Sequence, residues 1–172
     1  MTIASVHLDH LGVLPRMGLK GSEAAPWLRD RSIILPDEIF STGVFAGDGW
    51  IARLGAAEFL VEDSAKSNFV SQLWRDLSPL PTGVFPVHRS DVTFVLSGPE
   101  ARAVFAQTCA IDFSVAPPQH VIFSRVAGVS CGILPEVSAR VIKYRLWVEL
   151  SYAAYLWETL AGIVKELSGI AN

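Results

Sequence analysis

Apolar residues recur along this chain with two different spacings. Short apolar runs bounded by glycine, proline or charged residues are typical of β-strands. Such runs occupy residues 43–45, 49–54, 57–61, 84–87, 92–96, 121–126, 132–134, 139–142 and 145–149. Four stretches instead repeat bulky apolar residues every three or four positions, which predicts amphipathic helices over residues 22–31, 64–77, 101–107 and 151–167. This succession of neighbouring strands and isolated helices predicts an α+β fold built on antiparallel sheet.

Two short passages each occur twice in the chain, in the same order. The string LKGSEA at 19–24 is echoed by LSGPEA at 96–101, and EFLVEDS at 58–64 is echoed by RLWVELS at 145–151. Each passage leads from an apolar run into a predicted helix. Two echoes in one order favour an internal duplication over chance. With a boundary in the proline-rich segment 78–83, the sequence predicts two pseudo-repeated antiparallel-sheet/helix halves, 1–80 and 81–172, packed as one unit.

Composition and charge exclude some partners and leave others open. Of the 172 residues, 51% are hydrophobic and 18% charged, against about 45–50% and about 25% in ordinary domains. The excess favours either an apolar surface for a partner or simply a well-filled core. A net charge of −3 with scattered Lys and Arg argues against nucleic acid. No uncharged apolar run is long enough for a membrane span.

The two cysteines, Cys109 and Cys131, lack the spacing of a metal or redox motif. Because no secretory signal is recognisable at the N-terminus, reduced thiols in a cytoplasmic protein are expected.

No strong catalytic motif is present, so no catalytic residue is predicted. His7, Asp9 and His10 alternate near the N-terminus, but without a further ligand a solvated segment is favoured over a metal site. The polar segment His88-Arg89-Ser90-Asp91 interrupts two apolar runs. It either forms a turn or lines a binding cleft.

The last predicted helix carries three aromatic residues that cannot all face one core. Tyr152 and Tyr155 share a face, whereas Trp157 lies well round the helix. Since aromatic side chains are enriched at docking surfaces, one of these faces is a candidate interface. Core packing is the favoured explanation for Tyr155, and Tyr152 and Trp157 are taken as the candidate interface residues.

Five segments, in order, resemble the gamma subunit of heterotetrameric sarcosine oxidase. They are GLKG at 18–21 with Trp27-Leu28, RLGAAEFL at 53–60, LSGPEAR at 96–102, CAIDF at 109–113 and SYAAYLW at 151–157. The second resembles that family's LGPDEWLL, the fourth its CPLDL and the last its SYAxYLW. The family is similar in turn to the folate-binding N-terminal region of the glycine-cleavage T-protein, an aminomethyltransferase.

This resemblance implies a T-protein-like tandem α+β fold and a role in one-carbon metabolism of methylated amines. In the sarcosine oxidase complex the flavin, nicotinamide and folate chemistry belongs to other subunits. The resemblance therefore implies a non-catalytic subunit that binds flavoprotein oxidase subunits and carries no cofactor of its own. Self-association through the same surface is the other partner considered.

A second hypothesis is a free-standing folate-binding, aminomethyltransferase-like protein. The passage CGILPE at 131–136 keeps one glycine and one acid of the T-protein's GGxxDD turn, a departure that argues against aminomethyl transfer. Under this hypothesis Arg89 would pair with the glutamate tail of tetrahydrofolate, and Glu136 with a pterin nitrogen. The residues expected to line the cleft between the halves are His88, Arg89, Asp91, Glu136 and Tyr144.

Overall fold

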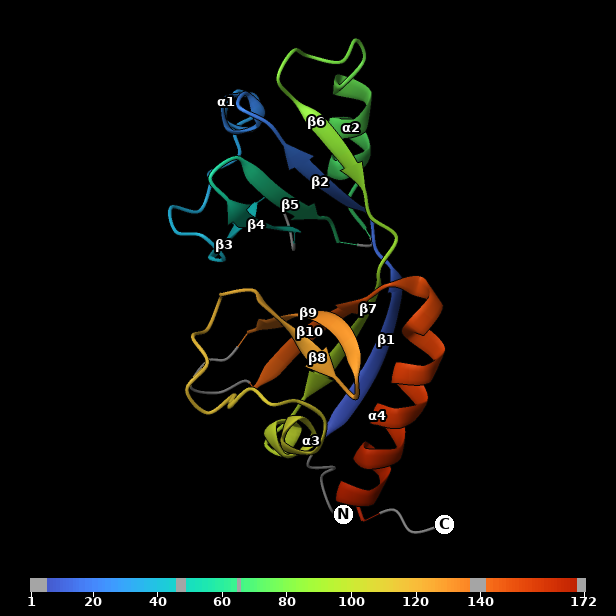
Figure 1. The fold of residues 1–172 in the computed structure, drawn as a ribbon. Coiled ribbons are helices and arrows are strands. Elements are labelled where there is room, and N and C mark those ends of the chain that lie inside the picture. The colour runs from blue at the N-terminus through green and yellow to red at the C-terminus, as the bar shows by residue number, and fades with distance from the viewer. Residues whose placement is uncertain (1–5, 46–48, 65, 137–141, 170–172) are drawn as a thin grey trace. The chain divides into compact units, whose positions relative to one another are not determined.

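Strand pairing and contacts separate the chain into two units. The structure is a computed structural model that describes residues 6–45, 49–64, 66–136 and 142–169. One unit is continuous in sequence and spans residues 14–90, and the other is discontinuous and combines residues 1–13 with 91–172. Each unit carries one five-stranded antiparallel sheet with helices, as Figure 1 shows, so the predicted α+β class is confirmed.

The continuous unit has its strands in the order β3-β4-β5-β2-β6. Its elements along the chain are β2 (Arg16–Lys20), α1 (Ala24–Arg29), β3 (Thr42–Phe45), β4 (Gly49–Gly55), β5 (Glu58–Glu62), α2 (Phe69–Asp76) and β6 (Phe85–His88). Its core forms where alternate strand residues such as Leu19 and Phe59 meet Leu28 of α1 and Leu73 of α2. Alternation along the strands and the helical repeat thus bury one face of each element.

The discontinuous unit has its strands in the order β1-β7-β10-β9-β8. Its elements are β1 (His7–Val13), β7 (Val92–Ser97), α3 (Ala101–Thr108), β8 (Ile122–Val126), β9 (Val129–Pro135), β10 (Lys143–Val148), a 3-10 turn (Leu150–Tyr152) and α4 (Ala153–Leu167). Phe94 and Leu146 pack against Phe105 of α3 and Leu156 of α4 in its core. The long helix α4 lies along the edge strand β1 (Figure 1).

The two units repeat one order of elements. Each runs strand, helix, three strands and helix, and the four strands take the orders β3-β4-β5-β2 and β8-β9-β10-β7. The fifth strand comes from after the last helix in one unit (β6, paired with β2) and from the N-terminal segment in the other (β1, paired with β7). The units are therefore interleaved in sequence, whereas the duplication hypothesis divides the chain at residue 80. The duplication itself stays a prediction.

The echoed strings form matching turns. Gly21 and Gly98 take φ of +117° and +108°, a conformation in which glycine avoids the strain of a side chain. Glu23 and Glu100 then occupy the N-cap positions of α1 and α3.

One predicted helix begins later in the structure than expected, and one predicted strand is not tested by it. The helix predicted from residue 64 begins at Phe69, because Asp63 first turns the chain: its carboxylate accepts hydrogen bonds from the backbone N–H groups of Ser64 and Val70, both at 3.1 Å. The strand predicted over 139–142 falls almost wholly outside the described residues.

Candidate functional site

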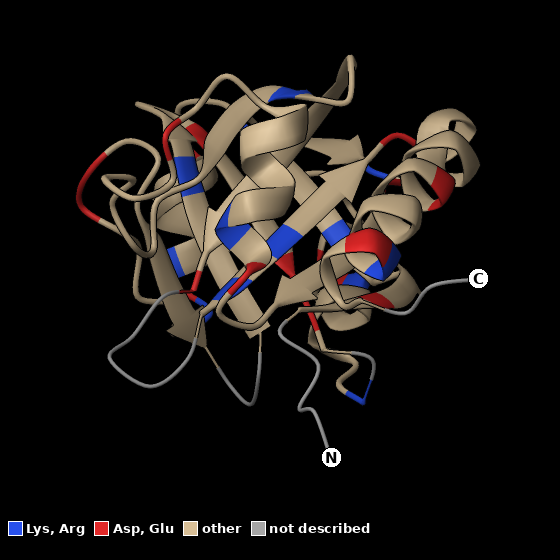
Figure 2. Cartoon of the chain, turned by 90° about the horizontal axis from the view of Figure 1, so that it is seen from below, with Lys and Arg blue, Asp and Glu red and all other residues tan. Residues whose placement is uncertain are grey.

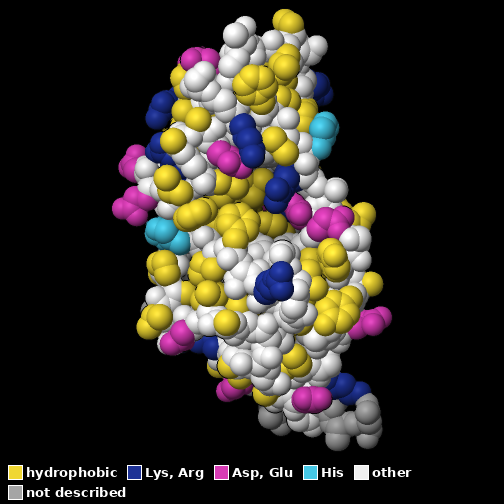
Figure 3. All heavy atoms as spheres, viewed as in Figure 1, with side chains coloured by type: hydrophobic (Ala, Val, Ile, Leu, Met, Phe, Trp, Pro, Cys, Tyr) yellow, Lys and Arg dark blue, Asp and Glu magenta, His cyan; other side chains and the backbone are white. Residues whose placement is uncertain are grey.

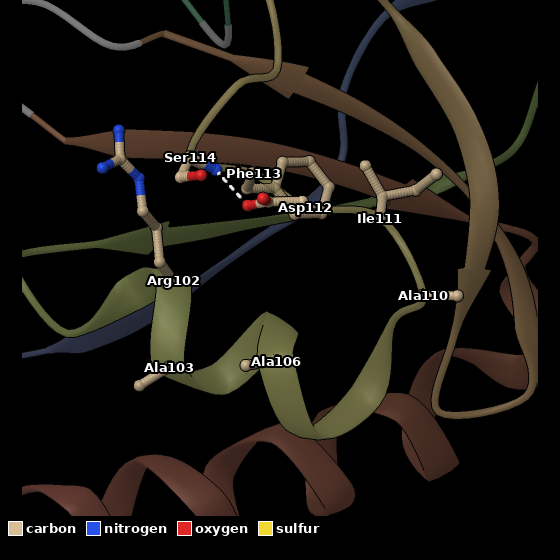
Figure 4. Close-up of a pocket in the computed structure, with 8 residues that line it drawn as sticks. All are labelled: Arg102, Ala103, Ala106, Ala110, Ile111, Asp112, Phe113 and Ser114. Atoms are coloured by element: carbon tan, nitrogen blue, oxygen red, sulfur yellow. Dashed lines mark hydrogen bonds between the residues drawn. The ribbon is translucent and has the colours of Figure 1, made fainter.

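A hollow of about 450 Å³ lies between α3 and the loop that follows it. Figure 4 shows its lining residues, which come from one face of α3 and from a loop of five consecutive residues: Arg102, Ala103, Ala106, Ala110, Ile111, Asp112, Phe113 and Ser114. Two of the segments that carry the family resemblance, 96–102 and 109–113, therefore meet at this hollow. Sequence reasoning quoted both segments without assigning their side chains a role.

Two side chains of opposite charge line the hollow, and each is hydrogen-bonded to a different neighbouring residue. The Nε of Arg102 donates to the hydroxyl of Tyr144 at 3.1 Å. The Asp112 carboxylate accepts from the backbone N–H of Ser114 at 2.8 Å. Hydrogen bonds from Ser114, together with the charge of Arg102, hold the pKa of Asp112 below its usual value. Asp112 is therefore ionised at neutral pH.

The five residues predicted to bind folate are divided between the two units. His88 and Arg89 belong to the continuous unit, and Asp91, Glu136 and Tyr144 to the discontinuous one. His88 lies on β6 and stacks on Trp74 of α2, with ring centroids 4.2 Å apart and planes 14° apart. The cleft proposed between the halves stays a prediction.

Glu136 and Tyr144 have their contacts on opposite sides of β10. The Glu136 carboxylate pairs with Lys143 Nζ at 2.8 Å and Arg145 Nε at 3.2 Å. Tyr144 is fully buried, with Phe105 and Phe113 in edge contact with its ring. Because successive side chains of a strand point to opposite faces, Tyr144 faces away from Lys143 and Arg145. The Glu136 carboxylate is thus held by cations on the other side of β10 from the Tyr144 ring.

Of the three aromatic residues at the start of α4, Tyr155 does not lie where it was expected. Tyr155 is 54% exposed, so core packing is wrong for it, and its hydroxyl donates to the Ala127 carbonyl at 3.1 Å. Tyr152 is 55% exposed. Trp157 is half-buried and packs against Phe94 and His10, with ring centroids 5.5 Å and 5.3 Å away.

A second hollow of about 280 Å³ runs beside Trp157, between α4 and the start of β1. His7 lines it, whereas the ring of His10 packs on Phe94 and Trp157. Within the described part of the chain no group of three or more His, Cys, Asp and Glu side chains is arranged to hold a metal ion.

Charges are mixed over the molecule. Blue Lys and Arg positions and red Asp and Glu positions are intermixed in Figure 2, and the dark blue side chains on the face seen in Figure 3 are scattered. That face therefore does not carry the clustered basic patch that binding to phosphate backbones requires. No helix among the described residues combines the length and the apolar character needed to cross a bilayer.

Comparison with known proteins identifies the fold. No protein-family model matches the sequence, and no curated protein matches it. A chain of heterotetrameric sarcosine oxidase from Corynebacterium sp. U-96, solved in complex with pyrrole 2-carboxylate, superposes with a TM-score of 0.78 at 17% identity. That match covers 98% of this chain and 88% of the oxidase chain.

The glycine cleavage system aminomethyltransferase T from Bartonella henselae superposes with a TM-score of 0.71 at 15% identity, over 94% of this chain and 46% of the enzyme. This chain has the fold that the two proteins share. It spans about half the length of the aminomethyltransferase. The likeness to both proteins that the sequence motifs indicated is confirmed at the level of the fold.

The two cysteines of this fold are free thiols in unequal surroundings. Burial in β9 raises the pKa of Cys131 to about 12, whereas Cys109 is half-buried. At pH 8 only about one in ten thousand Cys131 thiols would be ionised, and the thiolate is the reactive form.

We expect Ellman's reagent at pH 8 to titrate one thiol in the folded chain and two after denaturation. Cys109→Ser should remove the folded-state reaction, and two equally fast thiols in the folded chain would contradict this assignment.

Proposed function

We propose that this chain is a non-catalytic, gamma-like subunit of a sarcosine-oxidase-like complex in the metabolism of methylated amines. The observation that carries the proposal is the extent of the fold match. The chain covers 88% of one chain of a heterotetrameric oxidase, but 46% of the aminomethyltransferase. A match to nearly all of one chain of a heterotetramer supports a role as one component of a complex. The partners proposed are flavoprotein oxidase subunits, and the location proposed is the cytoplasm.

We also infer that the two units derive from one duplicated segment. The common order of strands and helices, and the matching turns at Gly21 and Gly98, support this inference. In such a duplication β1 would correspond to β6, displaced to the other end of the chain.

The docking surface proposed for the partner lies at the start of α4. Leu150, Tyr152 and Tyr155 are each more than half exposed there. Aromatic side chains with an apolar body and a polar tip contribute strongly to protein interfaces. Trp157 belongs to the proposed surface through the second hollow, although its packing on Phe94 also gives it a share in stability.

The subunit proposal predicts a coloured complex. A tagged chain expressed at normal level in its native host should elute with stoichiometric oxidase-like chains, identified by mass spectrometry, and with the visible absorbance of flavin. The double change Tyr152→Asp and Tyr155→Asp should reduce capture at least about tenfold, since aromatic hot spots each contribute about 2 kcal/mol or more. Both side chains are exposed, so the variant should stay folded.

Two controls make this experiment decisive. Val115→Asp alters an apolar residue of the same unit that is 78% exposed, and it should leave capture unchanged. Trp157→Ala should lower the melting temperature, because the indole packs against the core. A colourless, solitary wild-type chain would refute the subunit proposal, and a complex untouched by the Tyr changes would exclude this surface.

The alternative proposal is a free-standing folate-binding protein, supported by the fold match to the aminomethyltransferase. Its test uses Trp74, whose indole stacks on the proposed folate ligand His88. Saturable quenching of tryptophan fluorescence by tetrahydrofolate, reduced in a Trp74→Phe variant, is the expected result. A fluorescence signal that does not respond to saturating tetrahydrofolate would argue against this alternative.

A further inference from the structure

We propose that the hollow between α3 and residues 109–114 binds a small zwitterion of the amino-acid type, its carboxylate on Arg102 and its ammonium group on Asp112. The site lies wholly within the discontinuous unit. The proposal concerns a ligand of this chain itself and does not rest on the subunit assignment.

Arg102 is held in place at its Nε, which leaves the terminal amino groups of the guanidinium to recognise a ligand. Its Nε is bonded to the Tyr144 hydroxyl, and the Tyr144 ring is fixed in the core by Phe105 and Phe113. The two terminal amino groups of Arg102 make no hydrogen bond or ion pair to other residues in the described part of the chain. A planar guanidinium that presents two N–H groups side by side matches the two oxygens of a carboxylate.

The position of Arg102 is itself unfavourable for the helix. It lies in the first turn of α3, where the helix dipole disfavours a positive charge. Its Nε bond to Tyr144 accounts for one donor, but a neutral donor would serve that hydroxyl equally well. Residues that break a local rule are expected at functional sites, and anion recognition supplies a reason for a full charge here.

Asp112 supplies the opposite charge without neutralising Arg102. One carboxylate oxygen accepts from the Ser114 N–H, and the carboxylate forms no ion pair with Arg102 within the described residues. Each charge is thus held apart from the other by its own neighbour. Both side chains line one hollow, so a ligand that carries a carboxylate and an ammonium group is complementary to the pair.

The rest of the hollow determines which side chain the ligand can carry beside its carboxylate and ammonium groups. Figure 4 shows Arg102, Asp112 and Ser114 towards one end of the hollow, with Ala110 and Ile111 towards the other. A volume of about 450 Å³ lies within the range of small-molecule sites. The ligand class is therefore an amino acid or related zwitterion with an apolar side chain.

The test compares L-leucine with two molecules that each lack one charge. 4-Methylpentanoate lacks the ammonium group, and 3-methylbutylamine lacks the carboxylate. In a titration of the ¹⁵N-labelled full chain, followed by NMR, L-leucine should give saturable shifts at the Ser114 amide and at the Arg102 Nε–H. Each half-ligand should bind at least about tenfold more weakly, the loss of one charge-assisted contact.

Conservative variants assign the two roles. Arg102→Lys keeps the charge but loses the planar fork, and Asp112→Asn keeps an oxygen that can accept the Ser114 N–H but loses the charge. Each should weaken L-leucine at least about tenfold. The matched controls are Arg125→Lys and Asp9→Asn, which alter exposed residues of the same unit and should leave binding unchanged.

Three outcomes would overturn the proposal. They are an absence of saturable L-leucine shifts in the wild-type chain, shifts confined to residues away from the hollow, and half-ligands that bind as tightly as L-leucine. The wild-type titration alone decides these, whatever the stability of the variants.

Discussion

Replacing Glu62 with alanine is expected to destabilise the chain by about 3–5 kcal/mol, the cost of leaving a buried charge without its partner. Glu62 on β5 lies directly opposite Arg16 on β2, and their side chains form an ion pair with no solvent exposure. The same carboxylate accepts from the indole Nε1 of Trp50 on β4 at 2.8 Å. One side chain thus joins three neighbouring strands.

A matched control lies four residues away, at the other end of the same strand. Glu58 pairs with Lys20 at 3.1 Å, but these side chains are 39% and 53% exposed. Solvent screens such a pair, so Glu58→Ala should cost less than about 1 kcal/mol. Urea unfolding of the two variants measures the difference, and equal losses would contradict the assigned role of burial. The double change Arg16→Met with Glu62→Leu should recover most of the loss, since both charges are then absent.

This buried pair also marks a limit of prediction from sequence. The apolar run at 57–61 located β5 to within one residue, and Glu62, the last residue of the strand, lies just beyond that run. Arg16 is 46 residues earlier, and nothing in the sequence states that β2 and β5 pair in the register that aligns the two. Register depends on which faces are buried, and this becomes known only when the sheet is assembled.

Helix α4 shows a second limit. The apolar spacing predicted an amphipathic helix over residues 151–167, and Leu156 and Leu160 on its inner face are fully buried in the structure. Tyr155 was expected to pack in the core, but it lies with Tyr152 at the margin of the buried stripe, where both side chains are exposed. The apolar stripe of this helix is wider than the surface that contacts the sheet. The sequence therefore does not show which edge of the stripe the rest of the protein covers.

For the hollow at α3, the sequence contained both segments but not their chemistry. Arg102 and Asp112 are ten residues apart in sequence, so their lying at one hollow could be anticipated from the short connection between them. The decisive partner of Arg102 is Tyr144, 42 residues further on. Its hydroxyl orients the guanidinium, and only the pairing of β10 with β7 brings Tyr144 under α3.

Gly132→Ala is expected to destabilise the chain by about 3 kcal/mol, at the upper end of the cost of overfilling a packed site. Gly132 lies in β9 directly opposite Trp147 of β10. A Cβ added there would stand 2.1 Å from Cε2 of the Trp147 indole, which is only 2% exposed. The Trp147 indole occupies the space that a side chain at residue 132 would need, so β9 requires glycine at this position. This explains the one glycine that CGILPE retains, because packing within a strand requires it and no turn is involved.

The same substitution elsewhere should have the opposite sign. Gly162 lies inside α4 with open space where a Cβ would be built, so Gly162→Ala should stabilise the chain by about 0.5–1 kcal/mol through the helix preference of alanine. Urea unfolding of both variants gives the two free energies. Combining Gly132→Ala with Trp147→Leu should cost less than the sum of the two single changes, because the smaller side chain vacates the space that the new methyl needs. Strictly additive losses would show that Trp147 is not what excludes a side chain at residue 132, and the glycine would then need another explanation.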